Sequence, residues 1–151
     1  MNKMEKKMQT KIIIGSDHGG YELKNKIIKY LNEQNYQTID IGTNNTESCD
    51  YPTIAQTACH KIQEQVAEKA ILICGTGIGM SIAANKIKGI RAAVVSDTCS
   101  AKYSRLHNNT NVLCLGERII GIELAKEIVS VWLNTGFEQG RHQKRVDMLE
   151  N

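Results

Sequence analysis

The feature that most constrains this chain is a regular alternation of short β-rich apolar runs with longer amphipathic segments. The run KIIIGS at residues 11–16 has the composition of a strand, and residues 21–34 then repeat their apolar positions as a helix does. Because parallel strands need crossover connections, this order predicts an α/β fold, with helices on both faces of a parallel sheet of about five strands, in three layers. The other predicted strands are 36–42, 70–74, 90–96 and 111–115, and the other predicted helices are 53–67, 81–87, 100–107, 121–134 and 141–149.

The chain of 151 residues has the length of one domain, which we expect to occupy residues 11–151 with a C-terminal helix. Residues 1–10 are charged and lack the apolar segment of a signal peptide, so we expect a disordered N-terminal extension and a cytoplasmic protein. No apolar run is long enough to cross a membrane. The net charge of +3 is mild and the lysines are scattered among glutamates, so nothing favours binding to nucleic acid.

The five cysteines are widely spaced, without a CxxC pair or a Cys/His cluster of zinc-site spacing. The sequence therefore predicts neither a disulfide framework nor a metal site. Cys49, Cys59, Cys99 and Cys114 are expected to be reduced, mostly buried thiols. Cys74 is different, because it ends the apolar run of the stretch ILICGTGIGMS.

In open parallel sheets, ligands bind beyond the carboxyl ends of the strands. The residues that directly follow the predicted strands are therefore expected to converge on one crevice. They are Asp17-His18-Gly19-Gly20, Cys74-Gly75-Thr76-Gly77, Asp97 and Gly116-Glu117-Arg118.

Glycine recurs at positions 75, 77 and 79, which indicates a loop that needs positive φ or a close approach of its backbone. A phosphate-binding P-loop would continue with lysine and Ser/Thr, and the dinucleotide fingerprint would need glycine in place of Met80. Asp97, about twenty residues on, matches the usual place of a ribose-binding acid. A nucleotide-binding module therefore stays open as an alternative to an enzyme without a cofactor.

Cys74 heads this loop, where amide N–H groups of the glycines and of the next helix would create a positive nest. A thiol in such surroundings tends towards the thiolate and can act as a base or a nucleophile. The same amides could hold an oxyanion. Proton abstraction beside a carbonyl and acyl transfer both fit this arrangement, and the residues alone do not choose between them.

Other candidates carry weaker signals. Asp17 and His18 stand at a predicted strand end beside two glycines, whereas His107 is a lone histidine at the end of a predicted helix. Arg141 and Arg145 share one face of the last helix and could cradle a phosphate, although such pairs are usually a solvated face. Tyr51, in the turn CDYP, could line the crevice or simply pack on the surface.

Five motifs in order resemble ribose-5-phosphate isomerase type B, a family that includes isomerases of galactose 6-phosphate and allose 6-phosphate. They are GSDHGG (15–20), DYP (50–52), ILICGTGIGMSIAANK (71–86), RLHNNTNVL (105–113) and GRHQKRV (140–146). The resemblance extends from Lys11 to Val146. It implies a cofactor-free aldose–ketose isomerase of the pentose phosphate pathway on a Rossmann-like sheet, with no metal, assembled as a homodimer or homotetramer.

The resemblance also implies roles for single residues. Cys74 occupies the position of the base that moves a proton between carbons 1 and 2, with Thr76 assisting it. His107 matches the acid that opens the sugar ring, with Asp17 as its counterpart. The residues expected to bind substrate are Asp17, His18, Tyr51, Gly75, Thr76, Gly77, Ile78, Gly79, Asn108, Arg118, Arg141 and Arg145.

The function that the resemblance implies is interconversion of D-ribose 5-phosphate and D-ribulose 5-phosphate through a cis-enediolate. A six-carbon sugar phosphate as the main substrate, or a nucleotide-binding module without catalysis, are the alternatives. The active sites are expected to be shared between subunits. In that arrangement four residues, His107, Arg118, Arg141 and Arg145, would reach the Cys74 crevice of a second subunit.

Overall fold

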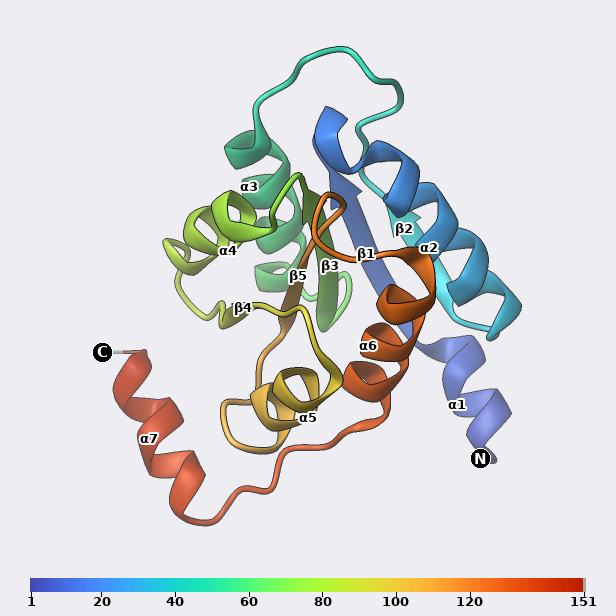
Figure 1. Cartoon of the computed structure of the whole chain (residues 1–151). Helices are drawn as coiled ribbons and strands as arrows, with labels where there is room; N and C mark the ends of the chain where they lie inside the picture. Colours follow the sequence, from blue (N-terminus) through green and yellow to red (C-terminus); the bar gives the residue numbers. More distant parts are fainter. Residues whose placement is uncertain (151) are drawn as a thin grey trace.

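The computed structural model describes residues 1–150, which form a five-stranded parallel sheet between two layers of helices (Figure 1). The strand order is β2-β1-β3-β5-β4, so the three inner strands are β1, β3 and β5. This confirms the predicted α/β class. The strands are β1 (Lys11–Ser16), β2 (Gln37–Asp40), β3 (Lys69–Cys74), β4 (Ala92–Val94) and β5 (Val112–Gly116).

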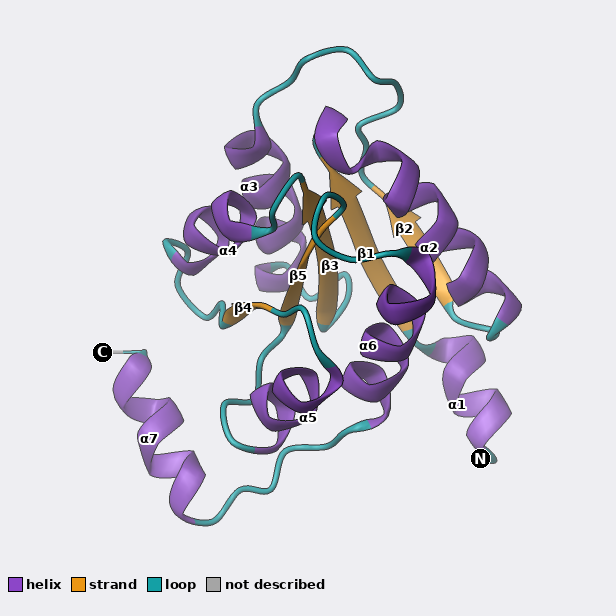
Figure 2. Cartoon of the chain, viewed as in Figure 1, coloured by secondary structure: helices purple, strands orange, loops and turns teal. Residues whose placement is uncertain are grey.

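Helices precede, connect and follow the strands, as Figure 2 shows by its alternation of colours. A short 3₁₀ turn, η1 (His18–Gly20), separates β1 from the first connecting helix. The helices are α1 (Lys3–Gln9), α2 (Tyr21–Glu33), α3 (Tyr51–Gln63), α4 (Ile78–Asn85), α5 (Thr98–Leu106), α6 (Ile122–Asn134) and α7 (Arg141–Leu149). Among the described residues, no helix combines the length and apolar character that crossing a membrane would require.

The inner strands divide the core into two clusters because successive side chains point to opposite faces of the sheet. Ile71 and Ile73 of β3 pack with apolar residues of α2, α5 and α6 on one face. Ala70, Leu72 and Cys74 pack with residues of α3 and α4 on the other face. Cys74 therefore points to the same side of the sheet as the helix that follows its own strand.

The strand order also fixes where a crevice can form. From β1 the chain continues to β2 on one side, and from β3 it continues to β4 on the other side. Two strands whose connections leave in opposite directions define the switch point of an open α/β sheet, where ligands bind. The carboxyl ends of β1 and β3 meet at this point, and they carry Asp17 and Cys74.

The sequence predicted most elements to within a few residues, and two differences matter. Helix α4 begins at Ile78 rather than Ser81, so the loop after Cys74 has only three residues. Residues 1–10, expected to be disordered, instead contain α1, closed by a capping box in which Asn2 Oδ1 accepts from Glu5 N–H and Asn2 N–H donates to Glu5. These local hydrogen bonds stabilise a helix in a segment whose composition suggested disorder.

Candidate active site

Cys74 is the last residue of β3, lies at the switch point and is 5% exposed. The Gly77 N–H donates a hydrogen bond to Cys74 Sγ over 3.1 Å. Gly77 adopts positive φ (78°) as the N-cap of α4, which folds its amide back over the sulfur. A backbone donor therefore faces the sulfur at the carboxyl end of β3.

The first turn of α4 adds free amides beside this sulfur. Among the described residues, the N–H groups of Gly79 and Met80 donate no hydrogen bond outside the helix, whereas Ile78 N–H donates to Thr76 Oγ1 over 3.3 Å. Such free donors, with the positive end of the helix dipole, suit an oxyanion. The amides that the sequence placed in a glycine loop are therefore partly those of a helix N-terminus.

The alternating glycines allow close approach of other parts of the chain. A Cβ on Gly79 would lie 2.7 Å from Cζ of the Tyr51 ring, and one on Gly75 would lie 3.3 Å from Nε of Arg118. Tyr51, Ile78, Thr76 and Arg118 are exposed, so accessible side chains surround the loop of Cys74 at the switch point. The pattern G-x-G-x-G thus brings Tyr51 and Arg118 against the loop of Cys74.

Asp17 and His18 form the neighbouring wall. Asp17 is buried, and its Oδ1 accepts from Gly19 N–H over 2.9 Å, while a Cβ on Gly19 would lie 3.3 Å from Gly75 N. His18 Nδ1 accepts from Cys49 N–H over 3.2 Å, so the proton of the neutral ring is on Nε2. The structure therefore brings Asp17, His18, Cys74 and Arg118 of one chain together, as the strand-end argument predicted.

Asp97 does not serve this crevice. Its side chain caps α5 by accepting from Ser100 N–H over 2.6 Å, and this bond lowers the pKa of the exposed Asp97 carboxyl. An acid engaged as a helix cap is not free for a ribose hydroxyl. The nucleotide-binding alternative loses the residue that supported it.

The other thiols differ from Cys74. Burial raises the pKa of Cys59 to about 12 and raises that of Cys114 well above its ordinary value, so both are inert at neutral pH. Cys49 is half-buried, but Cys99 is exposed, so the expectation of a buried thiol is wrong for Cys99. Its place in the first turn of α5 leaves the side chain on the solvent side.

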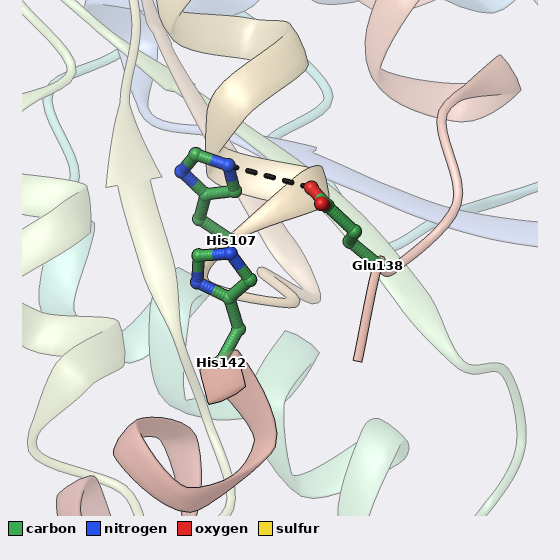
Figure 3. A group of neighbouring side chains, drawn as sticks. All are labelled: His107, Glu138 and His142. Atoms are coloured by element: carbon green, nitrogen blue, oxygen red, sulfur yellow. Dashed lines mark ion pairs between the residues drawn. The ribbon is translucent and has the colours of Figure 1, made fainter. Parts of the chain in front are cut away.

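A second group of polar side chains lies at the end of α5, and we call it the His107 cluster: His107, Glu138 and His142 (Figure 3). His107 Nε2 lies 3.5 Å from Glu138 Oε2, and the His107 and His142 rings stack with centroids 4.1 Å apart and planes 9° from parallel. Burial, His107, Arg141 and Arg145 lower the pKa of His142. A neutral His142 therefore supports the ring of His107 without competing for the Glu138 carboxylate.

The donor atoms of this cluster all lie within 4.8 Å of one another, which is close enough to consider a metal ion, although the sequence predicted none. The stacked rings argue against a preformed site. Ring nitrogens coordinate in the plane of the ring, and two parallel planes cannot share one ion unless a ring rotates. The cluster orients His107 rather than presenting a ready set of ligands.

A cavity of about 320 Å³ adjoins the His107 cluster and is lined by His107, Asn108, His142, Arg145, Val146 and Leu149. Asn108 and Arg145 are exposed, as is Arg141 at the first position of α7. The structure therefore brings the second set of expected site residues together as well. They form a separate group.

The two groups lie at opposite ends of the domain. Helix α5 starts beyond the carboxyl end of β4 and returns to the start of β5, so His107 lies towards the amino ends of the strands. In Figure 1 the loop from β3 to α4 lies above the sheet, whereas the end of α5 and all of α7 lie below it. The expectation that Arg118 reaches the Cys74 crevice of a second subunit together with Arg141 and Arg145 is not met, because Arg118 lies against Gly75 of its own chain.

Sequence reasoning missed Lys24 and Glu138, which support these groups, and placed Glu117 at the crevice without a contact. Glu117 Oε1 accepts from Leu23 N–H over 2.6 Å and so joins the β5 loop to the start of α2. Lys24 is 1% exposed and donates over 2.7 Å to both Asp40 Oδ1 and Thr43 O, which holds the loop before α3. Glu138 lies in the connector between α6 and α7, where no periodic pattern marks it. Its contact with His107, which is distant in the sequence, shows its part in the His107 cluster.

Comparison with known proteins places this fold and crevice among enzymes of the isomerase class. The family model described as Ribose/Galactose Isomerase matches residues 12–149. The chain belongs to this family. The crevice at the switch point and the cluster at the end of α5 both lie inside the matched residues.

Individual relatives agree with this assignment. The chain is 49% identical over 139 residues to ribose-5-phosphate isomerase B of Escherichia coli (strain K12), covering 92% of this chain and 93% of that protein. It is 45% identical to D-erythrulose-4-phosphate isomerase of Pectobacterium atrosepticum, covering 91% of each. The structure of ribose-5-phosphate isomerase B from Clostridium thermocellum superposes with a TM-score of 0.92 at 48% identity, covering 93% of this chain and 95% of that one.

Proposed function

We propose that this enzyme interconverts D-ribose 5-phosphate and D-ribulose 5-phosphate through a cis-enediolate, with Cys74 as the base. The observation that carries the proposal is the Gly77 N–H bond to Cys74 Sγ, beside the free amides of Gly79 and Met80. The end of β3 thus supplies the base, and the start of α4 supplies the donors that a developing enediolate needs. The names of the relatives support a sugar phosphate as substrate.

The proton transfer can be followed atom by atom. The Cys74 thiolate takes the proton from carbon 2 of the open-chain aldose, and the electron pair of that C–H bond forms the enediolate double bond as negative charge moves to oxygen 1. The amides of Gly79 and Met80 stabilise this charge, with Thr76 beside them. The hydroxyl proton of oxygen 2 passes to oxygen 1, Cys74 returns its proton to carbon 1, and oxygen 2 becomes the carbonyl of the ketose.

Ring opening and phosphate binding fall to the other residues. We propose that His107 protonates the ring oxygen of the cyclic sugar, with Asp17 accepting the hydroxyl proton across the site. Glu138, 3.5 Å from His107 Nε2, orients the imidazole for this step. His18, Arg118, Arg141 and Arg145 bind the phosphate, and Asn108 contacts a sugar hydroxyl.

These residues form two groups within one chain, so we propose that a complete site contains the Cys74 crevice of one subunit and the His107 cluster, Arg141 and Arg145 of another. Helix α7 supports this arrangement. Its Met148 and Leu149 are each 64% exposed, and only His142 and Val146 of the helix are buried in the chain's own domain. An exposed apolar end next to the proposed ligands suits contact with a second subunit in a homodimer or homotetramer.

Comparison of kcat/KM on sugar phosphates of different length tests the substrate. The highest value is expected on ribose 5-phosphate, with lower values on allose 6-phosphate, galactose 6-phosphate and erythrulose 4-phosphate. The erythrulose compound is included because a relative of 45% identity carries that name. A higher kcat/KM on a four- or six-carbon compound would reassign the substrate while leaving the base and its amides in place.

The role of His107 can be separated from that of Cys74. His107→Asn is expected to reduce turnover of the cyclic sugar phosphate about tenfold or more beyond its effect on the open-chain form, since general acids contribute about that much or more. The check is to assay both directions, with an open-chain ketose as the substrate that needs no ring opening. Equal losses would mean that His107 only shapes the site.

A further inference from the structure

A second polar cavity shares no lining residue with the cavity beside the His107 cluster. Its volume is about 390 Å³, and its walls come from α1, the start of β3, the end of α5 and the connector after α6. These are at the amino ends of the strands, opposite the edge that carries Cys74, and α1 lies below the sheet in Figure 1. We call it the basic cavity, and its walls include Lys3, Lys6, Lys7, Glu68, Lys69 and Arg105.

Five of these residues carry a basic group and one carries an acid. Among the described residues, none of the five forms an ion pair, and Glu68 forms none either. Burial, Arg105 and Lys6 lower the pKa of Lys69 to about 8. Gathering cations without a counter-ion is unfavourable, and a bound anion would relieve it. The basic members are Lys3, Lys6, Lys7, Lys69 and Arg105.

Arg105 makes the cavity more than a patch of surface lysines, because its side chain is 7% exposed. Its Nε donates to Thr135 O over 3.2 Å, and its Nη1 donates to Asn109 Oδ1 over 3.0 Å and to Thr110 O. All three acceptors are neutral, so the guanidinium is held in place without losing its charge. Its Nη2 donates to no described residue and is not buried.

We propose that the basic cavity binds a compact polyanion that carries at least two phosphate groups. A volume of this size is ordinary for a small-molecule site. A guanidinium with a free donor and a half-buried lysine provide fixed ligands, and the lysines of α1 provide mobile ones. A single phosphate could contact only part of this set, whereas a chain of two or three phosphates could reach both the α1 wall and Arg105.

The polyanion would not be the sugar phosphate of the proposed reaction. Three of the lysines stand in residues 3–7, outside residues 12–149 that the family model matches. The cavity is also lined by residues at the amino ends of the strands, whereas Cys74 lies at the carboxyl end of β3. The same Arg105 holds Asn109 and Thr110, so a ligand on its free Nη2 would act on the loop that carries His107 and Asn108.

Titration calorimetry of the full chain with sodium tripolyphosphate at low salt tests the proposal. Wild type is expected to bind one tripolyphosphate per chain more tightly than it binds inorganic phosphate. The triple variant Lys3→Gln, Lys6→Gln, Lys7→Gln and the single variant Lys69→Gln are each expected to bind about tenfold more weakly or worse, because each loses charge-assisted hydrogen bonds. Circular dichroism of both variants is expected to match that of wild type.

A matched control removes the same charge elsewhere. Lys26, Lys61 and Lys86 form no ion pair among the described residues and do not line the cavity. Their replacement by glutamine is expected to leave the affinity within about twofold, apart from general screening. A loss equal to that of the α1 variant would show a long-range charge effect and overturn the site.

The proposed active site also holds cations, so its contribution has to be separated. Arg141→Gln with Arg145→Gln is expected to retain tripolyphosphate binding. Loss of binding in that variant, with retention in Lys69→Gln, would place the anion at the active site and overturn the proposal. Tighter binding of a single-stranded oligonucleotide than of tripolyphosphate would also overturn it.

Proton uptake provides an independent readout. Near pH 8 about half of Lys69 is neutral in the free protein, and a bound anion would raise its pKa again. Binding is therefore expected to take up more proton in wild type than in Lys69→Gln, seen as a heat that depends on the ionisation enthalpy of the buffer. Taking the difference between the two proteins removes the proton that tripolyphosphate itself releases. The charged groups around Lys69 are Lys3, Lys6, Lys7, Glu68 and Arg105, together with the Tyr36 hydroxyl. Unchanged uptake in the variant would exclude Lys69 from the site.

Discussion

The Cys74 crevice and the His107 cluster are held in different ways. In the crevice, backbone amides and glycine contacts fix the reactive groups, and Cys74 and Asp17 are almost fully buried. In the cluster, long side chains meet across a connector and a terminal helix, and the His107 side chain is 37% exposed. Because backbone contacts hold the Cys74 crevice, its groups can be fully positioned within one chain. The exposed side chains of the His107 cluster and of α7, by contrast, are accessible to the active site of a second chain.

The largest expected effect is at the centre of the crevice. Cys74→Ala is expected to lower kcat by about 10²–10⁴, the usual loss with a general base, and to leave the fold intact. The check is kcat together with the midpoint of thermal unfolding. Because Cys99 is exposed, alkylation should modify both thiols, but substrate should protect only Cys74. Near wild-type activity in Cys74→Ala would mean that the crevice is built around another base.

The second prediction tests the division between chains. Cys74→Ala and the double variant Arg141→Ala, Arg145→Ala are each expected to be inactive, but their mixture should regain about a quarter of wild-type activity after subunit exchange. Half of the dimers would then be mixed, and each would contain one intact site of two.

Arg118 supplies the matched control for this mixing experiment. It lies against Gly75 of its own chain, so mixing Cys74→Ala with Arg118→Ala should leave every crevice damaged and restore nothing. Failure of the first mixture despite demonstrated exchange would place the arginines with Cys74 of the same chain. Recovery in the control mixture would separate Arg118 from Cys74.

The third prediction compares a glycine from each region. A Cβ on Gly116 would lie 2.6 Å from the carbonyl carbon and oxygen of Thr76. These are backbone atoms, so no change of side-chain rotamer can relieve the clash. Gly116→Ala is therefore expected to lower the free energy of unfolding by about 1–3 kcal/mol and to reduce kcat. Gly136, in the connector before α7, has no atom within 4 Å of such a Cβ, so Gly136→Ala should change stability by less than about 0.5 kcal/mol.

Urea unfolding of both glycine variants measures this difference directly. Similar losses at the two positions would mean that the connector is packed as tightly as the crevice. In that case α7 would be part of the chain's own core, and the case for completion by a second subunit would weaken.

The same contrast explains what the sequence could predict. The ranges of β1 and α7 were predicted as found, because apolar patterns and a preceding glycine mark them. The start of α4 was missed because Gly77 and Gly79 suggested a loop, although glycine costs little at an N-cap and in a first turn. Local sequence patterns thus predict the presence of a helix or strand better than they predict the residue at which it begins or ends.

For the site, the strand-end rule found Asp17, Cys74 and Arg118, since topology alone brings them together. It could not reveal that Glu138 pairs with His107 or that His142 stacks on it, because these contacts cross more than thirty residues of sequence. Contacts between distant side chains depend on packing that no short motif encodes.

The smallest expected effect concerns the attachment of α7 through His142. The pKa of His142 in the folded chain is below its ordinary value of 6.5, because of burial, His107, Arg141 and Arg145, while Glu138 opposes the shift. Above that value the imidazole is neutral in both states and contributes no pH dependence. As the pH falls through 6.5, the unfolded chain takes up the proton more readily than the folded chain. Acidification therefore removes stability through this group.

Unfolding by urea at about pH 7.5 and about pH 5.5 measures this loss, which should be larger in wild type than in His142→Asn, because asparagine does not titrate in this range. Cys74→Ser should behave as wild type, since it leaves the cluster untouched. Hydrogen exchange should place the acid-induced opening in α7 rather than in β3, where the crevice is held by the backbone. Equal pH dependence in wild type and His142→Asn would remove His142 as the group that attaches α7. If β3 also opened at the same pH, the free energies of opening of α7 and β3 would be equal. The two regions would then not differ in local stability as their contacts suggest.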